Sequence, residues 1–314
     1  MQDKQPKPET ISLYEFFAKF PNEESARIYF EEKRWSVTKC CPHCGSLGVS
    51  ECKDHKPMAY RCKDCRKHFS VRTGTMLEES RLPLQKWLMA IYMMTTARKG
   101  IPSTQMAKEL GITQKSAWFL AQRIRESWFS KSTDDNNGGL NNVVEVDETF
   151  IGGKEKNKHA SKKLNAGRGG VGKAVVVGIK QRGGAVVAQV VENTNAATLQ
   201  GFIGANVQSG TTVYTDDFKS YRGLVGYTHD SVKHSVGEYV KHQVHTNGIE
   251  SFWSLLKRGY YGVYHYMSHK HLHRYVNEFA FRHNTAQFGT MQFIEATITH
   301  MTHQRLTYKE LTHG

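Results

Sequence analysis

The chain has 314 residues, of which 39 % are hydrophobic, and its formal net charge of +14 corresponds to a pI near 9.4. This composition excludes a disordered or fibrous protein. The sequence shows neither a secretory signal nor the run of about 18 apolar residues that a membrane helix needs. We therefore expect a soluble, cytoplasmic protein without a membrane partner, whose positive charge favours a polyanionic partner.

Residues 1–35 are predicted to form a short helical entry, because apolar side chains recur there at helical spacing. The first such set is Leu13, Phe16, Phe17 and Phe20. Residues 36–72 follow and contain all six cysteines of the chain. In the reducing cytosol such a cluster favours metal binding over disulfides.

Four of these cysteines form two C-x2-C pairs separated by residues 45–61: Cys41, Cys44, Cys62 and Cys65. Each two-residue spacer lets a tight turn aim both sulfurs at one ion, and four thiolates complete the tetrahedral shell of Zn²⁺. We predict a closed, structural zinc ribbon, with Cys40 and Cys52 outside the ligand set. Basic residues around the ribbon indicate either a contact with DNA or a solvated face: Lys53, Lys56, Arg61, Lys63, Arg66 and Lys67.

Residues 80–130 are predicted to be helical, and part of this segment has the pattern of a helix-turn-helix. Ser103 is expected to cap the first helix and Gly111 to end it, and Thr113 is expected to cap the second helix. The second helix carries polar side chains suited to the major groove: Lys115, Ser116, Gln122 and Arg123. An ordinary helical hairpin is the alternative. The Gly- and Asn-rich residues 131–142 are predicted to be a linker.

Residues 143–290 are predicted to form an α/β domain. Strands are expected at 143–151, 174–180, 185–192, 211–215 and 231–235, and helices at 196–207, 247–258 and 269–284. This element order is typical of a ribonuclease-H-like domain. Residues 154–173 are predicted to be a basic loop, which either contacts DNA phosphates or is a plain surface loop, and residues 291–314 a C-terminal tail.

Three carboxylates in the α/β domain form a candidate catalytic site. Asp147 lies inside an apolar strand, where a charge is costly unless it is paired or binds a metal. Asp216 ends another strand, and Glu250 lies on an amphipathic helix. Oxygens from two strands and a helix can hold two Mg²⁺ ions. Lys257 follows on the face of that helix that carries Glu250, where it could hold a DNA phosphate.

The chain resembles the transposases of bacterial insertion sequences, specifically the group with an N-terminal zinc ribbon and a catalytic domain of DDE type. The matching pieces are the four-cysteine ribbon, VEVDETFIGGK around Asp147, VYTDDFKSY around Asp216 and HTNGIESFWSLLKRG around Glu250. The resemblance covers roughly residues 25–285. It implies a ribonuclease-H-like fold and a DDE-K catalytic set of Asp147, Asp216, Glu250 and Lys257.

The resemblance also implies Mg²⁺ or Mn²⁺ as the catalytic metal, and the terminal inverted repeats of the element and target DNA as partners. The location that it implies is the bacterial cytoplasm, in association with the nucleoid. Three neighbours remain alternative site residues. Asp217 stands next to Asp216, and Asn247 is a rival to Glu250. Glu148 is a rival to Asp147, although strand alternation directs it to the opposite face of the sheet.

The function expected from these features is the cutting and joining of DNA by direct in-line attack at phosphorus, without a covalent protein–DNA intermediate. Water first frees the 3′ ends, and each 3′-hydroxyl then attacks target DNA. Cleavage at two transposon ends favours a homodimer or a larger assembly. One alternative is a zinc-ribbon and helix-turn-helix regulator with an inactive α/β domain, and another is a nuclease or junction resolvase on the same fold.

Overall fold

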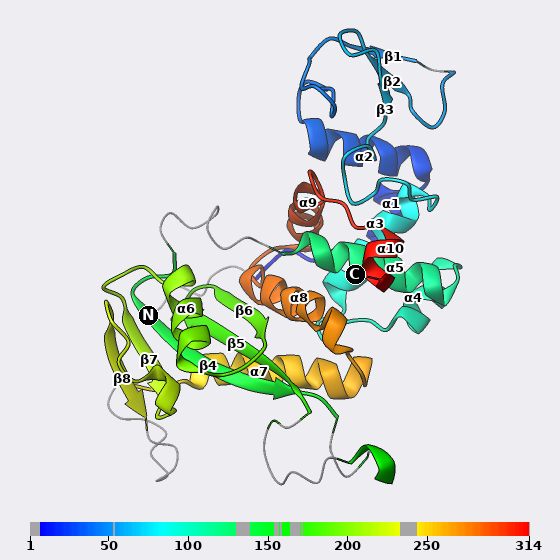
Figure 1. Ribbon diagram of the computed structural model, residues 1–314. Coiled ribbons are helices and arrows are strands. Elements are labelled where there is room, and N and C mark those ends of the chain that lie inside the picture. Colours follow the sequence, from blue (N-terminus) through cyan, green and yellow to red (C-terminus); the bar gives the residue numbers. More distant parts are fainter. Residues whose placement is uncertain are drawn as a thin grey trace. The chain divides into compact units, whose positions relative to one another are not determined.

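The computed structural model of the chain describes residues 7–52, 54–129, 139–153, 157, 159–163, 170, 172–232 and 244–313 (Figure 1). The chain divides into two compact units, one of residues 1–128 with 287–314 and the other of residues 129–286. Most of the predicted linker at 131–142 and of the predicted basic loop at 154–173 lies outside the described residues. Within the described ranges, no helix is both long enough and apolar enough to cross a membrane.

The first unit begins with two short helices, α1 (Leu13–Lys19) and α2 (Glu23–Trp35). Ser12 caps α1 through a reciprocal pair of hydrogen bonds with Glu15, and Asn22 caps α2 in the same way. The buried rings of Phe20 and Tyr29 join the two helices, with their centroids 4.9 Å apart. A three-stranded antiparallel sheet follows, made of β1 (Val49–Glu51), β2 (Tyr60–Cys62) and β3 (His68–Phe69).

Three helices come next: α3 (Leu84–Thr96), α4 (Ser103–Leu110) and α5 (Gln114–Ser127). Gly111 ends α4 in the left-handed conformation, with φ of 59°, and the Thr113 hydroxyl caps α5 by accepting from the backbone N–H of Ser116. Both of these predictions from the helix-turn-helix pattern are confirmed. Ser103 is not the cap of α4, because Pro102 occupies that position and the Ser103 hydroxyl accepts from Gln114 instead.

The polar face predicted for α5 is shorter than expected. Gln122 and Arg123 are buried, with exposed fractions of 0 % and 3 %. The Arg123 guanidinium donates to the backbone carbonyls of Leu306 and Glu78, at 2.9 and 3.0 Å. The last turns of α5 therefore lie inside the unit, and only its first turn, with the exposed Lys115, is free to face a groove of DNA.

The C-terminal residues complete the first unit. The segment 291–314, expected to be a tail, contributes most of α9 (Thr290–His300) and all of α10 (Tyr308–His313). In α9 the Thr297 hydroxyl accepts from the Trp128 indole at 3.0 Å, and the Phe293 ring meets that indole edge-on. These residues therefore belong to the core of the first unit, although they are far from it in sequence.

The second unit is built on a five-stranded sheet. Its strands are β4 (Val143–Ile151), β5 (Ala174–Gln181), β6 (Val186–Val191), β7 (Thr212–Asp216) and β8 (Thr228–Val232), in the order β6-β5-β4-β7-β8. The first three pair in antiparallel fashion, and β7 and β8 are parallel to β4. This mixed order is the ribonuclease-H-like topology, as predicted. The last strand begins earlier than the predicted 231, and residues 233–235 lie outside the described residues.

Helices cover both faces of this sheet (Figure 1). On one face, α6 (Ala196–Asn206) packs on the inward side chains of β4 and β7, such as Val144 and Val213. On the other face, α7 (Asn247–Gly259) and α8 (Leu272–Asn284) pack on a core that includes Val176. Strands buried on both faces explain the nearly continuous apolar runs of the sequence.

A glycine allows α7 to approach the sheet closely. A Cβ atom at Gly178 of β5 would lie only 2.6 Å from the ring of Trp253. Gly178 is the strand partner of Asp147. The indole of α7 therefore lies directly over the position in the sheet where the first candidate carboxylate stands.

Candidate functional site

The four predicted zinc ligands lie together in the first unit. The ligand atoms of Cys41, Cys44, Cys62 and Cys65 all lie within 4.8 Å of one another. Two turns present them, and the residue after the second cysteine of each pair is left-handed: Gly45 with φ of 75° and Arg66 with φ of 59°. This arrangement fits the tetrahedral preference of Zn²⁺. Cys40 and Cys52 are outside the cluster, as predicted.

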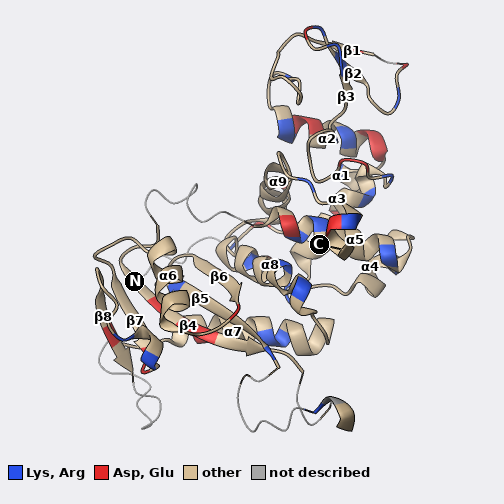
Figure 2. Cartoon of the chain, viewed as in Figure 1, with Lys and Arg blue, Asp and Glu red and all other residues tan. Residues whose placement is uncertain are grey.

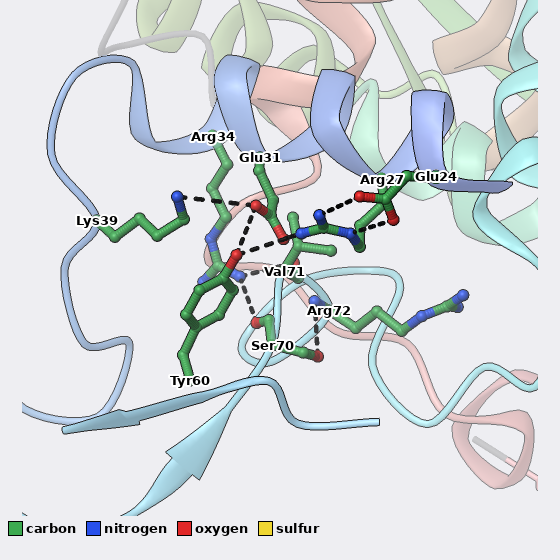
Figure 3. Close-up of polar contacts among 9 residues, drawn as sticks. All are labelled: Glu24, Arg27, Glu31, Arg34, Lys39, Tyr60, Ser70, Val71 and Arg72. Carbon is green, nitrogen blue, oxygen red and sulfur yellow. Dashed lines mark hydrogen bonds and ion pairs between the residues drawn. The ribbon is translucent and has the colours of Figure 1, made fainter. Parts of the chain in front are cut away.

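The zinc ribbon is anchored on α2 by a polar network (Figure 3). The carboxylate of Glu31, which is 9 % exposed, accepts from the Tyr60 hydroxyl at 2.7 Å and also from Arg27. Arg34 donates to the carbonyls of Ser70, Val71 and Thr73 at the far end of the ribbon. The helix and the ribbon therefore form one structural module, although the sequence predicted a boundary between residues 35 and 36.

The candidate catalytic carboxylates lie in the second unit, where Asp147 and Asp216 occupy neighbouring parallel strands. The register pairs Glu145 of β4 with Tyr214 of β7. Asp147 and Asp216 each follow by two residues, so they stand level on adjacent strands. Burial, together with the charges of Glu148 and Asp216, raises the pKa of Asp147 to about 7. The strand register places the carboxylates of Asp147 and Asp216 on neighbouring strands, and like charges oppose ionisation at short range, which explains the direction of the shift.

The two faces of β4 separate Asp147 from Glu148. The carboxylate of Asp147 accepts from the Trp253 indole of α7 at 3.0 Å. Glu148 accepts from the Tyr221 hydroxyl at 2.7 Å, within the core that α6 covers. Burial raises the pKa of Glu148, which the charge of Asp216 raises as well. Asp216 thus lies near both carboxylates, and Asp147 is the one directed toward α7.

Glu250 and Lys257 come from α7. Glu250 lies in the first turn, where it accepts from the Thr246 hydroxyl at 2.9 Å, and Trp253 follows one turn later. Helical spacing places Lys257 on the same face as these two residues. Among the residues that the structure describes, only the four cysteines bring three or more ligand atoms within 4.8 Å. The structure therefore brings Asp147 and Asp216 together, but Glu250 does not join them in so tight a cluster.

Glu145, a third acidic residue of β4, was not predicted from the sequence as part of the site. This side chain is 1 % exposed, and it accepts from the backbone N–H groups of Gly248 and Ile249 at the start of α7. Its other oxygen accepts from Arg182 at 3.0 Å. A charged residue two positions before Asp147, in the same apolar strand and on the same face, was the signal that could have identified it.

Comparison with known families matches both units. Residues 139–284 match the ISXO2-like transposase domain, and residues 21–68 match the transposase zinc-ribbon domain. The second match includes α2 as well as the ribbon, in agreement with the module described above.

Two relatives support this assignment. The chain is 31 % identical over 254 residues to an uncharacterized protein in transposable element ISH50 from Halobacterium salinarum, which covers 76 % of this chain and 83 % of that protein. It is also 31 % identical over 100 residues to an uncharacterized transposase-like protein from Haemophilus influenzae, covering 31 % of this chain and 80 % of that one.

Solved structures give a weaker likeness. The Mos1 strand transfer complex aligns with a TM-score of 0.28 and 11 % identity, covering 67 % of this chain and 73 % of that chain. A pre-cleavage Mos1 transpososome aligns with a TM-score of 0.27 and 11 % identity, covering 68 % and 78 %. TM-scores this low carry no argument, so the fold assignment rests on the strand order. From the family matches and the relative in ISH50, the chain belongs to the ISXO2-like family of DDE transposases with an N-terminal zinc ribbon.

Proposed function

We propose that this chain is an active transposase that binds the terminal inverted repeats of an insertion sequence and catalyses metal-dependent DNA cleavage and strand transfer. The observation that carries the proposal is the placement of Asp147 and Asp216, each two residues beyond the paired Glu145 and Tyr214, on adjacent parallel strands in a chain of this family. A pure DNA-binding protein has no need for two half-buried carboxylates that repel each other.

The donor set fits a divalent metal. Carboxylate oxygens are the ligands that Mg²⁺ and Mn²⁺ prefer, and Asp147, Asp216 and Glu250 are the residues that would hold the ions. A cation at this position would offset the repulsion that raises the pKa of Asp147. Two such ions would supply activation of the attacking oxygen and stabilisation of the leaving oxygen.

The protein's own side chains would orient the acidic groups and the DNA. The Trp253 indole holds the Asp147 carboxylate by donating a hydrogen bond to it. Lys257 would bind a phosphate of the transposon end from the same face of α7 that carries Glu250. In the first step water attacks phosphorus in line and frees a 3′ end. In the second step that 3′-hydroxyl attacks target DNA, and no protein nucleophile is required.

The first unit would provide DNA binding. Five basic residues of the ribbon are exposed, and basic residues of the ribbon appear in blue in Figure 2: Lys56, Arg61, Lys63, Arg66 and Lys67. The first turn of α5 adds Lys115, which is also exposed. Such positive surfaces bind the phosphate backbone by releasing counterions. Two transposon ends must be processed together, so we expect a homodimer or a larger assembly on DNA.

The test is strand transfer in Mg²⁺ or Mn²⁺ on DNA that carries the encoding element's own terminal repeats. We expect the wild-type chain to join the ends to target DNA. Asp216→Asn and Glu250→Gln should each lower the rate about a thousandfold or more. Asp217→Asn is the matched control, because it removes the neighbouring acid, and it should retain most of the activity.

Each alternative predicts a different result. A regulator with an inactive α/β domain would bind the repeats without cleaving or joining them in either metal. A nuclease or junction resolvase would cleave DNA without joining the ends to a target. Loss of activity in Asp217→Asn but not in Asp216→Asn would move the catalytic assignment by one residue.

A further inference from the structure

Three further residues precede the candidate carboxylates on the same three elements. Glu145, Tyr214 and Gly248 each stand two positions before Asp147, Asp216 and Glu250, respectively. On the two strands, residues two apart share a face. Glu145 and Tyr214 are also direct partners in the register of β4 and β7. Contacts among Glu145, Tyr214 and Gly248 therefore join β4, β7 and α7, the three elements that carry the candidate carboxylates.

Glu145 joins β4 to the start of α7. One of its oxygens accepts from the backbone N–H groups of Gly248 at 2.7 Å and Ile249 at 3.1 Å. These N–H groups lie in the first turn of the helix, where the backbone has no internal acceptor and where the helix dipole favours a negative charge. The carboxylate therefore caps α7 from another element, and it joins the first turn of α7 to β4.

Gly248 leaves room for the Glu145 carboxylate in this contact. A Cβ atom at Gly248 would lie 2.6 Å from the same carboxylate oxygen of Glu145, and 3.1 Å from the Lys180 side chain. A larger residue would displace either the Glu145 carboxylate or the first turn of α7. Glu250 lies in that same turn, so either displacement would alter the contact between β4 and the element that carries Glu250.

Arg182 extends the contact to β7. Its Nε donates to the second oxygen of Glu145 at 3.0 Å, and its terminal nitrogen donates to the backbone carbonyl of His245 at 3.1 Å. The same guanidinium lies over the ring of Tyr214, 4.8 Å from the centroid. One arginine, from the turn between β5 and β6, thus contacts β4, β7 and the segment that leads into α7.

We propose that the Glu145–Arg182 pair is a positioning device that sets the relative placement of all three candidate metal-binding carboxylates. This inference rests on the function proposed above. Neither side chain is assigned a contact with metal or DNA. The pair acts through the backbone of α7 and the ring of Tyr214. Supporting residues of this kind commonly contribute about 10- to 100-fold to metal affinity or activity, because small displacements of a site are costly.

Two substitutions separate positioning from folding. Glu145→Gln keeps the size of the side chain, but its amide cannot accept from both the α7 backbone and Arg182. Arg182→Lys keeps the charge, but a single ammonium cannot replace the planar guanidinium at three contacts. Arg182 is 26 % exposed in its side chain, so this second variant is expected to fold even if Glu145→Gln does not.

The matched control is Glu278→Gln. Glu278 is 0 % exposed in the same unit, but its carboxylate accepts from Arg282 and Tyr264 instead. This variant loses a buried charge pair of similar kind without altering the hydrogen bonds of Glu145. It should lower thermal stability and leave the metal affinity of the folded protein unchanged.

The experiment measures Mn²⁺ binding to the purified full-length chain by electron paramagnetic resonance, beside strand transfer as a function of Mn²⁺ concentration. We expect Glu145→Gln to weaken the Mn²⁺ affinity that depends on Asp147 about tenfold or more. Arg182→Lys should weaken it by a smaller factor, and Glu278→Gln should not change it. Higher Mn²⁺ should restore part of the lost strand transfer in the Glu145 and Arg182 variants.

The outcomes distinguish this inference from the proposed function. If wild type binds Mn²⁺ and transfers strands while the Glu145 and Arg182 variants match it, the positioning role is wrong and the proposed function stands. Equal loss of Mn²⁺ affinity in Glu278→Gln would also overturn it, since general destabilisation would then explain the effect. If wild type shows neither Asp147-dependent Mn²⁺ binding nor strand transfer, the proposed function and this inference fall together.

Discussion

Asp147 combines burial, a hydrogen bond from Trp253 and two acidic neighbours at one position of a strand interior. In the absence of a cation, the ionised carboxylate repels its neighbours in a medium that screens charge poorly. Such an arrangement costs stability and is typical of a site whose purpose is binding rather than folding. A substitution at Asp147 is therefore the most direct test of metal binding.

Replacement of Asp147 should separate metal binding from stability. We expect Asp147→Asn to abolish strand transfer while the metal-free variant melts at the wild-type temperature or above it, because the substitution removes a repelling charge. Mn²⁺ at about 100 times its Kd should stabilise the wild-type chain by about 2.7 kcal/mol, and Asp147→Asn should gain much less. Thermal melts with and without Mn²⁺ measure both effects. A variant that is stabilised by Mn²⁺ as strongly as wild type would exclude Asp147 as a ligand.

At the scale of elements, the zinc ribbon depends on its metal. Its strands are only two or three residues long, so metal ligation must supply much of the folding free energy. We expect one zinc per chain, lost in Cys62→Ser and retained in Cys52→Ser, with elemental analysis as the measurement. Limited proteolysis should then cut Cys62→Ser within the ribbon first. Wild-type zinc content in Cys62→Ser would contradict the ligand assignment.

The packing of α8 on the sheet predicts an acid-sensitive contact. Lys180 of β5 donates to Nε2 of His283 on α8 at 2.9 Å, which requires a neutral imidazole. Burial, together with the charge of Lys180, lowers the pKa of His283 to about 4. The unfolded chain takes up this proton near its ordinary pKa of about 6.5. Stability from this contact is therefore complete above about pH 6.5 and is lost as pH falls toward 4.

The substitution that tests this contact is His283→Gln, which keeps an acceptor for Lys180 but does not titrate. Between about pH 7 and about pH 4.5 its melting temperature should fall less than that of the wild-type chain. His269→Gln is the control, because His269 is exposed. This substitution should leave the pH dependence of the melting temperature as it is in the wild-type chain. Parallel pH profiles for His283→Gln and wild type would show that the contact does not titrate as argued.

At the scale of the whole molecule, the net charge of +14 predicts DNA binding that weakens steeply with salt. Replacing Lys63, Arg66 and Lys67 of the ribbon by Gln should lower the slope of log K against log salt, by up to about 0.9 for each phosphate that the variant no longer neutralises. Lys19→Gln is the control, an exposed lysine at the end of α1. Binding assays at several salt concentrations give the slopes. An unchanged slope in the triple variant would show that these three ribbon residues do not contact DNA phosphates.

The division into two units also separates two activities in these tests. The ribbon and the helices α4 and α5 lie in the first unit, and Asp147, Asp216 and Glu250 lie in the second. Substitutions in the ribbon should therefore affect repeat binding, and substitutions at the carboxylates should affect joining at equal occupancy of the DNA. Binding without joining by the wild-type chain would instead support a regulator with an inactive second unit.

Local patterns determined much of this protein from its sequence. Two C-x2-C pairs predicted the four-cysteine cluster, and the alternation of apolar runs with turns predicted β4 to β7 to within about two residues. Such features depend on residues that are near each other in the chain. A tight turn aims the two sulfurs of a pair at one ion, and a strand that is covered on both faces has a nearly continuous apolar run. The strand order then followed from the element order.

Only the tertiary structure decided which polar groups are buried. Gln122 and Arg123 were expected to face DNA, yet both are buried, and Arg123 donates to the carbonyls of Leu306 and Glu78 from distant parts of the chain. Residues 291–314 fold back on helices that precede them by about 200 residues. The role of Glu145 in joining β4 to α7 was identified only from its hydrogen bonds with the α7 backbone and with Arg182. Periodicity reports which face of an element is apolar, but the partner that covers a polar residue comes from a distant segment, so its burial is a property of the assembled fold.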